Sequence, residues 1–277
     1  MSQFDPATTE VLATNLWFGS QNAARLSAGT IALEEIYARR QMVRCFYVNC
    51  SRQSAAVHDI RDFRLYRKGL RAVRSYLARR RPERVILLGG GCAVSVPVIA
   101  YLRSIYPRLR VVWLDAHGDL HLPSTSRSKY VHGMALGMLL DPATYTMFFS
   151  DGQHLTPETV ALCGQKALDP YEHQFIVDRR IATMACDDRA ELFAGSFFGD
   201  TPPPPVYVHV DLDVLHPDVY LNPKCDIPAG LDLAKLAEIV ATIHRFAPIV
   251  GYSIAENFET DPRKVAELVE AFRLLSP

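Results

Sequence analysis

The stretch VVWLDAHGDLH, residues 111–121, joins an apolar run typical of a buried strand to a cluster of acidic and imidazole side chains. The stretch VYVHVDLDVLHPD, residues 206–218, repeats this arrangement. Alternate residues of an extended chain point the same way, so the polar side chains of each stretch can converge past its strand end. These side chains are Asp115, His117 and Asp119 in the first stretch and Asp211 and Asp213 in the second. Loops at the carboxyl ends of parallel strands build ligand crevices, so we expect a functional site there.

Outward from these two stretches, apolar runs rich in β-branched residues alternate with segments of helical periodicity, which predicts a parallel sheet with crossover helices. Strands are expected at Val43–Val48, Arg84–Leu88, Arg110–Leu114, Thr144–Phe148, Thr159–Gly164, Val206–Val210 and Ile249–Ser253. Helices are expected at about Asn22–Gln41, Arg61–Arg80, Val94–Ile105, Asp187–Phe197, Leu231–Phe246 and Asp261–Leu275. No internal repeat or shift in composition divides the chain, so we expect one domain over residues 1–277.

Composition excludes several classes of protein. With 277 residues, of which 49% are hydrophobic, the chain can bury a sizeable core and is not disordered. The 30 basic residues balance the 30 acidic ones, so no charge excess favours nucleic acid or an anionic membrane. The N-terminus lacks the pattern of a secretory leader, no apolar stretch is long enough to span a membrane, and the six cysteines are scattered. We expect a cytoplasmic protein with reduced thiols.

The carboxylates of the two stretches indicate a metal centre. Burying several of them together costs many kcal/mol through desolvation and repulsion unless cations neutralise them. Oxygen and imidazole ligands suit Mn²⁺, Mg²⁺ or Fe²⁺ better than a structural zinc site. A lone Asp-x-Asp motif also occurs in solvated loops and single-ion sites, but two motifs at two strand ends favour a pair of bridged ions.

Six segments resemble motifs of the ureohydrolases, the family of arginase, agmatinase and formiminoglutamase. They are LGGGCAVS (88–95), DAHGDLH (115–121), HGMAL (132–136), ALDPYEH (167–173), HVDLDVLHPD (209–218) and GYSIAENF (251–258). The resemblance runs from about Val85 to Phe272. It implies a three-layer α/β/α, arginase-like fold with a mainly parallel sheet of about eight strands. It also implies two Mn²⁺ at the carboxyl ends of the strands.

The resemblance assigns roles to individual residues. Asp115 and Asp211 would bridge both ions, Asp119 would join the first ion, and His117 and Asp213 would bind the second. His132 falls where the family has a proton-shuttling histidine, and Glu256 where a glutamate pairs with a guanidinium group. The implied catalytic residues are therefore His132, Asp213 and Glu256, around a metal-bridging hydroxide that attacks the substrate.

Cys92 departs from the family pattern, because it stands where the first metal-ligand histidine is expected. A thiolate can bind a metal but is softer than Mn²⁺ prefers. Three outcomes remain open: Cys92 ligates a weakened first site, that site is empty, or another metal fills it. A branch of the family that includes N-hydroxyarginine hydrolases of D-cycloserine biosynthesis is similar to this chain in having cysteine there.

The residues that would hold the head of an amino acid substrate are less clearly marked. In ungapped register with arginase they are His121, Ser126, Ser128 and Asp169. The two serines keep hydroxyls for a carboxylate, Asp169 could pair with an α-ammonium, and His121 replaces an asparagine. Arg127 and Lys129 are additional and favour an anionic group.

The leading hypothesis is a binuclear-metal hydrolase that cleaves the C–N bond of a small-molecule guanidino substrate. Arginine or N-hydroxyarginine would give urea or hydroxyurea and ornithine. The same chemistry on agmatine, another guanidino acid, formiminoglutamate or peptide-linked arginine is a second interpretation. A third, from another class, is a metal-impaired homologue that acts as a binding or regulatory subunit. The family commonly forms trimers or hexamers, so a homo-oligomer is a further expectation.

Overall fold

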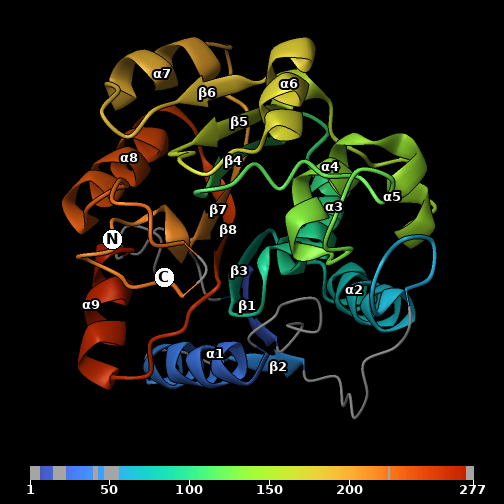
Figure 1. Ribbon diagram of the computed structural model, residues 1–277, viewed down its shortest axis with the longest axis horizontal. Coiled ribbons are helices and arrows are strands. Elements are labelled where there is room, and N and C mark those ends of the chain that lie inside the picture. Colours follow the sequence, from blue (N-terminus) through green and yellow to red (C-terminus); the bar gives the residue numbers. More distant parts are fainter. Residues whose placement is uncertain (1–6, 15–22, 40–42, 47–55, 224, 273–277) are drawn as a thin grey trace.

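One parallel sheet of eight strands organises the computed structural model, which describes residues 7–14, 23–39, 43–46, 56–223 and 225–272 (Figure 1). The strands are β1 (Thr9–Thr14), β2 (Arg44–Phe46), β3 (Arg84–Leu88), β4 (Arg110–Leu114), β5 (Val160–Cys163), β6 (Ala182–Met184), β7 (Val206–Asp211) and β8 (Ile249–Ala255). Their order across the sheet is β2-β1-β3-β8-β7-β4-β5-β6, and every pairing is parallel.

Helices cover both faces of the sheet and complete three layers (Figure 1). One face is covered by α2 (Phe63–Arg80), α3 (Ser95–Ile105), α4 (Ala135–Leu140) and α5 (Pro142–Phe148), and α6 (Pro170–Arg179) adds Ile176 to the same core. The other face is covered by α1 (Ala23–Ala38), α7 (Ala190–Phe197), α8 (Leu233–Phe246) and α9 (Pro262–Ala271). The predicted three-layer α/β/α fold with about eight parallel strands is confirmed. Within the described residues, no helix has the length and apolar character needed to cross a membrane.

The central strands are apolar on both sides because both sides are packed. In β3, Val85 and Leu87 enter the core beneath α2 and α3, whereas Ile86 and Leu88 enter the opposite core. The β-branched and leucine side chains therefore fill two cores at once, as is usual in parallel sheets. This explains why the strongest apolar runs of the sequence coincide with β3, β4, β7 and β8.

One predicted strand is wrong. Residues Thr144–Phe148 lie in helix α5, where Asp141 caps the N-terminus by accepting hydrogen bonds from the backbone N–H and the hydroxyl of Thr144, each at 2.7 Å. Pro142 occupies the first turn, where its missing N–H costs nothing. These start signals outweigh the strand propensity of threonine and tyrosine. The sequence prediction also missed β1, β6, α4 and α6.

The other predicted elements are confirmed, with ends that differ by a few residues. Parts of three predictions, at residues 22, 40–41, 47–48 and 273–275, lie outside the described residues. The important consequence of the topology is the order β3-β8-β7-β4 at the centre of the sheet. Chain segments that leave these four strands meet at one edge, which is where ligands bind in open α/β sheets.

Candidate metal centre

Each central strand delivers an ionisable side chain to the same edge of the sheet. Leu114 of β4 pairs with Val210 of β7, so the residues that follow, Asp115 and Asp211, lie side by side. Asp211 itself pairs with Ala255 of β8, which places Glu256 next to them. Cys92 follows β3 after a turn of three glycines and begins the short 3-10 turn Cys92–Val94 that leads into α3.

The first group of candidate metal ligands is built around Asp115. His117 Nδ1 lies 3.0 Å from Asp213 Oδ2 and 3.5 Å from Asp115 Oδ1, and ligand atoms of all three residues lie within 4.8 Å of one another. Backbone N–H groups hold both carboxylates in place, since His117 N donates to Asp115 at 2.7 Å and Ala116 N donates to Asp213 at 3.0 Å. The indole Nε1 of Trp113 donates to the other oxygen of Asp115 at 3.0 Å. Two carboxylates and an imidazole are thus preorganised around one point.

The second group is built around Cys92. Its thiol donates to Asp211 Oδ2 at 2.9 Å, and Glu256 lies close enough for one ligand atom of each of the three residues to fall within 4.8 Å of the others. Asp119 lines the same cavity as these residues, and its Oδ2 is buried and accepts no hydrogen bond from the described residues. Asp119 does not arrive there by strand alternation, because the chain bends after Asp115 and Asp119 has a left-handed φ of 53°. Backbone strain of this kind concentrates at functional sites.

Burial makes this concentration of charge costly in the absence of cations. Burial first, and then repulsion from Asp213, raises the pKa of Asp115 from 3.8 to about 7. Burial and the neighbouring carboxylates raise the pKa values of Asp119 and Asp211 well above 3.8, and they raise the pKa of the Cys92 thiol in the same way. The metal-free protein therefore favours protonated side chains here, whereas bound cations would favour the ionised forms.

His117 forms attractive pairs with Asp115 and Asp213. Burial opposes a charge on His117, but its hydrogen bonds with Asp115 and Asp213 outweigh burial and raise the pKa of the imidazole above 6.5. Burial likewise opposes a charge on Asp213, yet the hydrogen bond with His117 holds the pKa of that carboxyl below 3.8. In the metal-free protein an imidazolium therefore compensates part of the negative charge.

The donor set fits a pair of divalent cations. Four aspartates, a histidine and a cysteine lie together beneath the cavity, and the four carboxylates are at most 4% exposed. Buried carboxylates without an excess of cationic partners are rare unless a metal balances them. The structure brings the six predicted ligands together, and they remain candidate ligands: Cys92, Asp115, His117, Asp119, Asp211 and Asp213.

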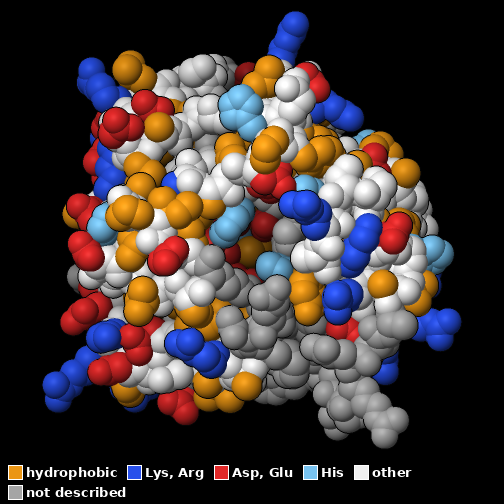
Figure 2. All heavy atoms as spheres, viewed as in Figure 1, with side chains coloured by type: hydrophobic (Ala, Val, Ile, Leu, Met, Phe, Trp, Pro, Cys, Tyr) orange, Lys and Arg blue, Asp and Glu red, His pale blue; other side chains and the backbone are white. Residues whose placement is uncertain are grey.

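A cavity of about 490 Å³ opens over this cluster. Figure 2 shows it as a hollow in one face of the molecule, with acidic side chains at the floor and histidines at the rim. On one wall His132 Nδ1 lies 4.0 Å from Glu256 Oε1. Gly91 permits this approach, because a Cβ at that position would lie 2.9 Å from the same oxygen. Among the lining residues are Cys92, His117, Asp119, His121, Ser128, His132, Asp169, Glu172, Asp211, Asp213 and Glu256.

The predicted head-group residues lie at the outer end of the cavity, with one exception. His121 Nε2 and Asp169 Oδ2 are hydrogen bonded at 2.8 Å, and the other oxygen of Asp169 caps α6 by accepting from Glu172 N at 2.9 Å. Ser128 lines the cavity. Ser126 is buried and accepts the backbone N–H of Lys129 at 3.0 Å, and it is not part of the lining.

Two residues at the site were not singled out in the sequence. Glu172 is buried at the cavity wall and accepts backbone N–H groups of Leu120 and Asp169, each at 3.3 Å. Its signal was available, since an acidic residue three positions after Asp169 forms a capping box. The other is His209, a fully buried imidazole on β7 beside Asp115 and Cys92. A polar residue inside the run VYVHVD was the only signal for it.

Fold and site together define a three-layer α/β protein with a carboxylate-rich centre at the topological switch of a parallel sheet. A sequence profile described as "Arginase family" matches residues 21–266, so the chain belongs to the arginase family. The arginase of Staphylococcus aureus (strain COL) is 35% identical over 103 residues, which are 37% of this chain and 34% of that protein. The chain thus aligns with about a third of that relative's length.

Solved structures agree on the fold. The arginase of Entamoeba histolytica, in complex with L-ornithine, superposes with a TM-score of 0.80 at 18% identity over 95% of this chain and 97% of that one. The arginase of Bacillus caldovelox also has a TM-score of 0.80, at 19% identity, over 99% of this chain and 98% of that one. The family and the arginase-like fold predicted from the motifs are confirmed.

Proposed function

We propose that this protein is a metal-dependent hydrolase that cleaves the guanidino group of arginine or N-hydroxyarginine, giving urea or hydroxyurea and ornithine. One observation carries the proposal: a buried centre of carboxylates lies at the floor of a cavity whose wall bears a buried glutamate and a histidine. Membership of the arginase family supports it. The L-ornithine bound by the Entamoeba relative is the amine product that such a reaction would release.

The proposed cofactor is two Mn²⁺. Cys92 and Asp119 would hold the first ion, His117 and Asp213 would hold the second, and Asp115 and Asp211 would contribute to both. When bound, such ions supply a water molecule of lowered pKa and positive charge opposite the developing negative charge of the reaction. Cys92 makes the first site a softer one than Mn²⁺ prefers.

Glu256 is the proposed partner of the guanidinium group. Its carboxylate is 2% exposed and faces the cavity, so a planar cation beside it would form charge-assisted hydrogen bonds shielded from water. The backbone at Glu256 has a φ of 55° and is held in place by its N–H, which donates to Gly90 O at 2.9 Å. A fixed carboxylate orients the guanidino carbon over the metal centre.

His132 is the proposed donor of the proton that the leaving amine requires. It begins the 3-10 turn His132–Met134, lies beside Glu256 and is about a quarter exposed. An imidazole there can take a proton from solvent and release it inside the cavity, where the amine departs. Asp213 would accept the proton of the attacking water, since it faces the same cavity.

The test is a comparison of substrates and of two matched variants. Metal-reconstituted protein is assayed with L-arginine, N-hydroxy-L-arginine, agmatine and formiminoglutamate, and urea, hydroxyurea or formamide is quantified. Glu256→Gln is expected to reduce kcat/KM for guanidino substrates about 100-fold or more, because it removes one partner of a buried ion pair. Glu259→Gln is the control, since Glu259 lies on the same loop but pairs with Lys264 at 3.3 Å, away from the cavity. Equal loss in both variants, or no loss in Glu256→Gln, would refute the assignment.

A second substrate class is favoured by the state of Asp169. Both of its oxygens already accept hydrogen bonds, one from His121 and one from Glu172 N. An α-ammonium group would have to share the Asp169 carboxylate with His121, whereas an acylated or peptide-linked arginine has no such group to place. Greater turnover of an N-acylated arginine than of free arginine would establish this alternative, and the reverse preference would exclude it.

A further inference from the structure

His209 is a buried imidazole that the proposed reaction does not use. It lies in the middle of β7, between Trp113 of β4 and Ser253 of β8 in the sheet register, and it is fully shielded from solvent. Its neighbours two positions along the strand are Tyr207 and Asp211, so it shares their face of the sheet. It therefore points to the same side as the metal-binding group, one layer deeper in the core.

The ring of His209 is fixed from three directions. Nδ1 is hydrogen bonded to the hydroxyls of Ser95 and Ser253 at 2.9 and 2.8 Å, and the ring stacks on Trp113 with centroids 3.6 Å apart. The remaining nitrogen, Nε2, is buried and has no hydrogen-bond partner among the described residues. A buried polar atom without a partner is costly, which makes a missing ligand the natural explanation.

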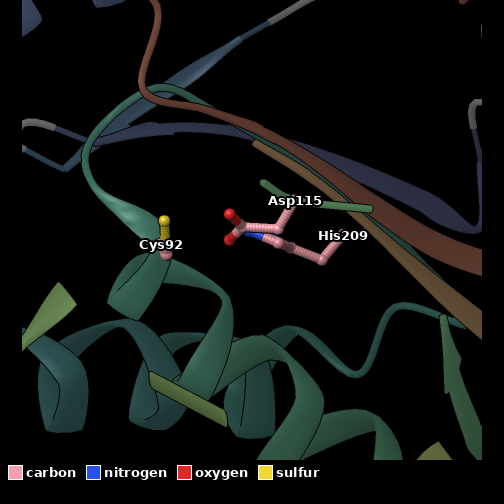
Figure 3. A group of neighbouring side chains, drawn as sticks. All are labelled: Cys92, Asp115 and His209. Atoms are coloured by element: carbon pink, nitrogen blue, oxygen red, sulfur yellow. The ribbon is translucent and has the colours of Figure 1, made fainter. Parts of the chain in front are cut away.

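Two other potential metal ligands lie directly beside this ring. Ligand atoms of Cys92, Asp115 and His209 all fall within 4.8 Å of one another. Figure 3 shows the Cys92 sulfur, from the 3-10 turn that precedes α3, and the Asp115 carboxylate on the side of the imidazole that faces the site. Trp113 connects them further, because it stacks on His209 and donates to Asp115.

We propose that His209 is a ligand of the first metal site, together with Cys92 and Asp115. This inference rests on the metal centre of the proposed function. It supplies from β7 the imidazole that is absent at position 92. The hydrogen bonds of Nδ1 to two serines are the outer contacts that usually orient a metal-binding histidine and leave the other nitrogen for the metal.

The donor set predicts which ion this site takes. Thiolate and imidazole favour Zn²⁺, Co²⁺ or Fe²⁺ over Mn²⁺, whereas the site formed by His117, Asp213 and the shared Asp115 has oxygen and imidazole donors that suit Mn²⁺. The two sites should therefore differ in metal preference. In place of two Mn²⁺, this inference predicts a mixed centre, with a thiophilic ion beside Cys92 and Mn²⁺ beside His117.

The experiment measures metal binding without substrate. Chelator-treated protein is titrated with Zn²⁺, with Mn²⁺ and with Co²⁺ as a spectroscopic probe, and bound metal is counted after dialysis. Wild-type protein should bind two ions and show thiolate-to-cobalt charge-transfer absorption. His209→Gln should weaken Zn²⁺ binding at one site about 100-fold or more, since even outer contacts of metal ligands are worth 10- to 100-fold. Cys92→Ser should abolish the charge-transfer band.

Matched controls separate ligand loss from general damage. Cys163→Ser removes a buried thiol of β5 from the opposite core, and His173→Gln removes an exposed histidine of α6. Both should keep two ions and the cobalt spectrum. The fold of each variant is checked by circular dichroism.

A second experiment keeps His209, so its result does not depend on whether the His209→Gln variant folds. X-ray absorption at zinc in His117→Ala protein should still show sulfur and imidazole scattering from one ion. Absence of imidazole scattering at zinc in the His117→Ala protein would overturn the inference. Unchanged Zn²⁺ affinity in folded His209→Gln protein would also overturn it. If those results coexist with urea formation, the proposed function stands and only this inference fails. If two ions bind through His209 but no substrate is turned over, this inference stands and the proposed function fails.

Discussion

Without metal, the stability of this protein should fall as pH rises from about 4 to 7. The folded state raises the pKa of Asp115 from 3.8 to about 7, chiefly through burial. A carboxyl group with a raised pKa binds its proton more tightly in the folded than in the unfolded chain. Its contribution to stability is therefore greatest below pH 4, decreases through the window, and is lost above pH 7.

The expected magnitude follows from the size of the shift. A tenfold change in proton affinity corresponds to about 1.4 kcal/mol, so the rise from 3.8 to about 7 is worth about 4 kcal/mol for Asp115 alone. Asp119 and Asp211 act in the same direction because their pKa values are also raised. His117 adds to the trend above pH 6.5, where the unfolded chain loses the proton that folded His117 keeps. Asp213 acts only below pH 3.8, because its pKa is lowered.

The assay is urea unfolding between pH 4.5 and 7.5, in chelator and in excess Mn²⁺. We expect a falling profile in chelator and a flatter or rising one with metal, since cations stabilise the ionised carboxylates. Asp115→Asn should reduce the slope by about 1.4 kcal/mol per pH unit. Asp188→Asn, which alters an exposed carboxylate bonded to Ala185 N, should leave it unchanged. A metal-free profile that is constant or rises over this range would refute the account of the buried carboxylates.

Two further predictions concern the loops around the sheet. Arg61 donates to Ser128 O at 3.0 Å and so anchors the loop at the mouth of the cavity. Arg61→Ala should raise KM about 3- to 10-fold with little change in kcat, whereas the control Arg64→Ala, at an exposed position, should change neither. A fall in kcat in steady-state kinetics of Arg61→Ala would contradict this prediction. Asp141→Ala removes the N-cap of α5 and both hydrogen bonds to Thr144, so the free energy of unfolding should fall by about 0.5–2 kcal/mol. An unchanged midpoint of urea unfolding would show that the cap does not stabilise the helix.

The fold was predictable where burial leaves few alternatives. β3, β4, β7 and β8 are central strands packed on both faces, and their unbroken apolar runs are hard to confuse with surface helices. The edge strand β6 has only three residues, Ala182–Met184, and carries no comparable signal. Thr144–Phe148 was misassigned because strand propensity was weighed above the helix start at Asp141-Pro142. Local capping chemistry decided the structure there.

The floor of the site was predictable for a similar reason. Carboxylates that follow apolar strands must lie at the strand ends, and parallel strands end at one edge, so Asp115 and Asp211 were expected at the same edge. The pairing of β4 with β7, which only the structure shows, makes them neighbours. The sequence could not show how side chains at the rim pair with each other. Asp169, the proposed ammonium contact, is hydrogen bonded to His121, which lies 48 residues earlier in the chain. Ser126 looked like a ligand contact, but it closes its own loop instead.

At position 92 a cysteine stands in place of a ligand histidine, and a residue outside that motif can compensate for the lost imidazole. Viewed along the sequence, a cysteine at a histidine position indicates a weakened site, and His209 looks like one more residue of a buried strand. The sheet register changes that interpretation, because the pairing of Trp113 with His209 and of His209 with Ser253 brings the imidazole under Cys92. An interior strand position that carries an imidazole with one unpartnered nitrogen is costly to keep unless something binds there. In the proposed centre the metal preference therefore follows from Cys92 and His209 together, and neither residue alone would predict it.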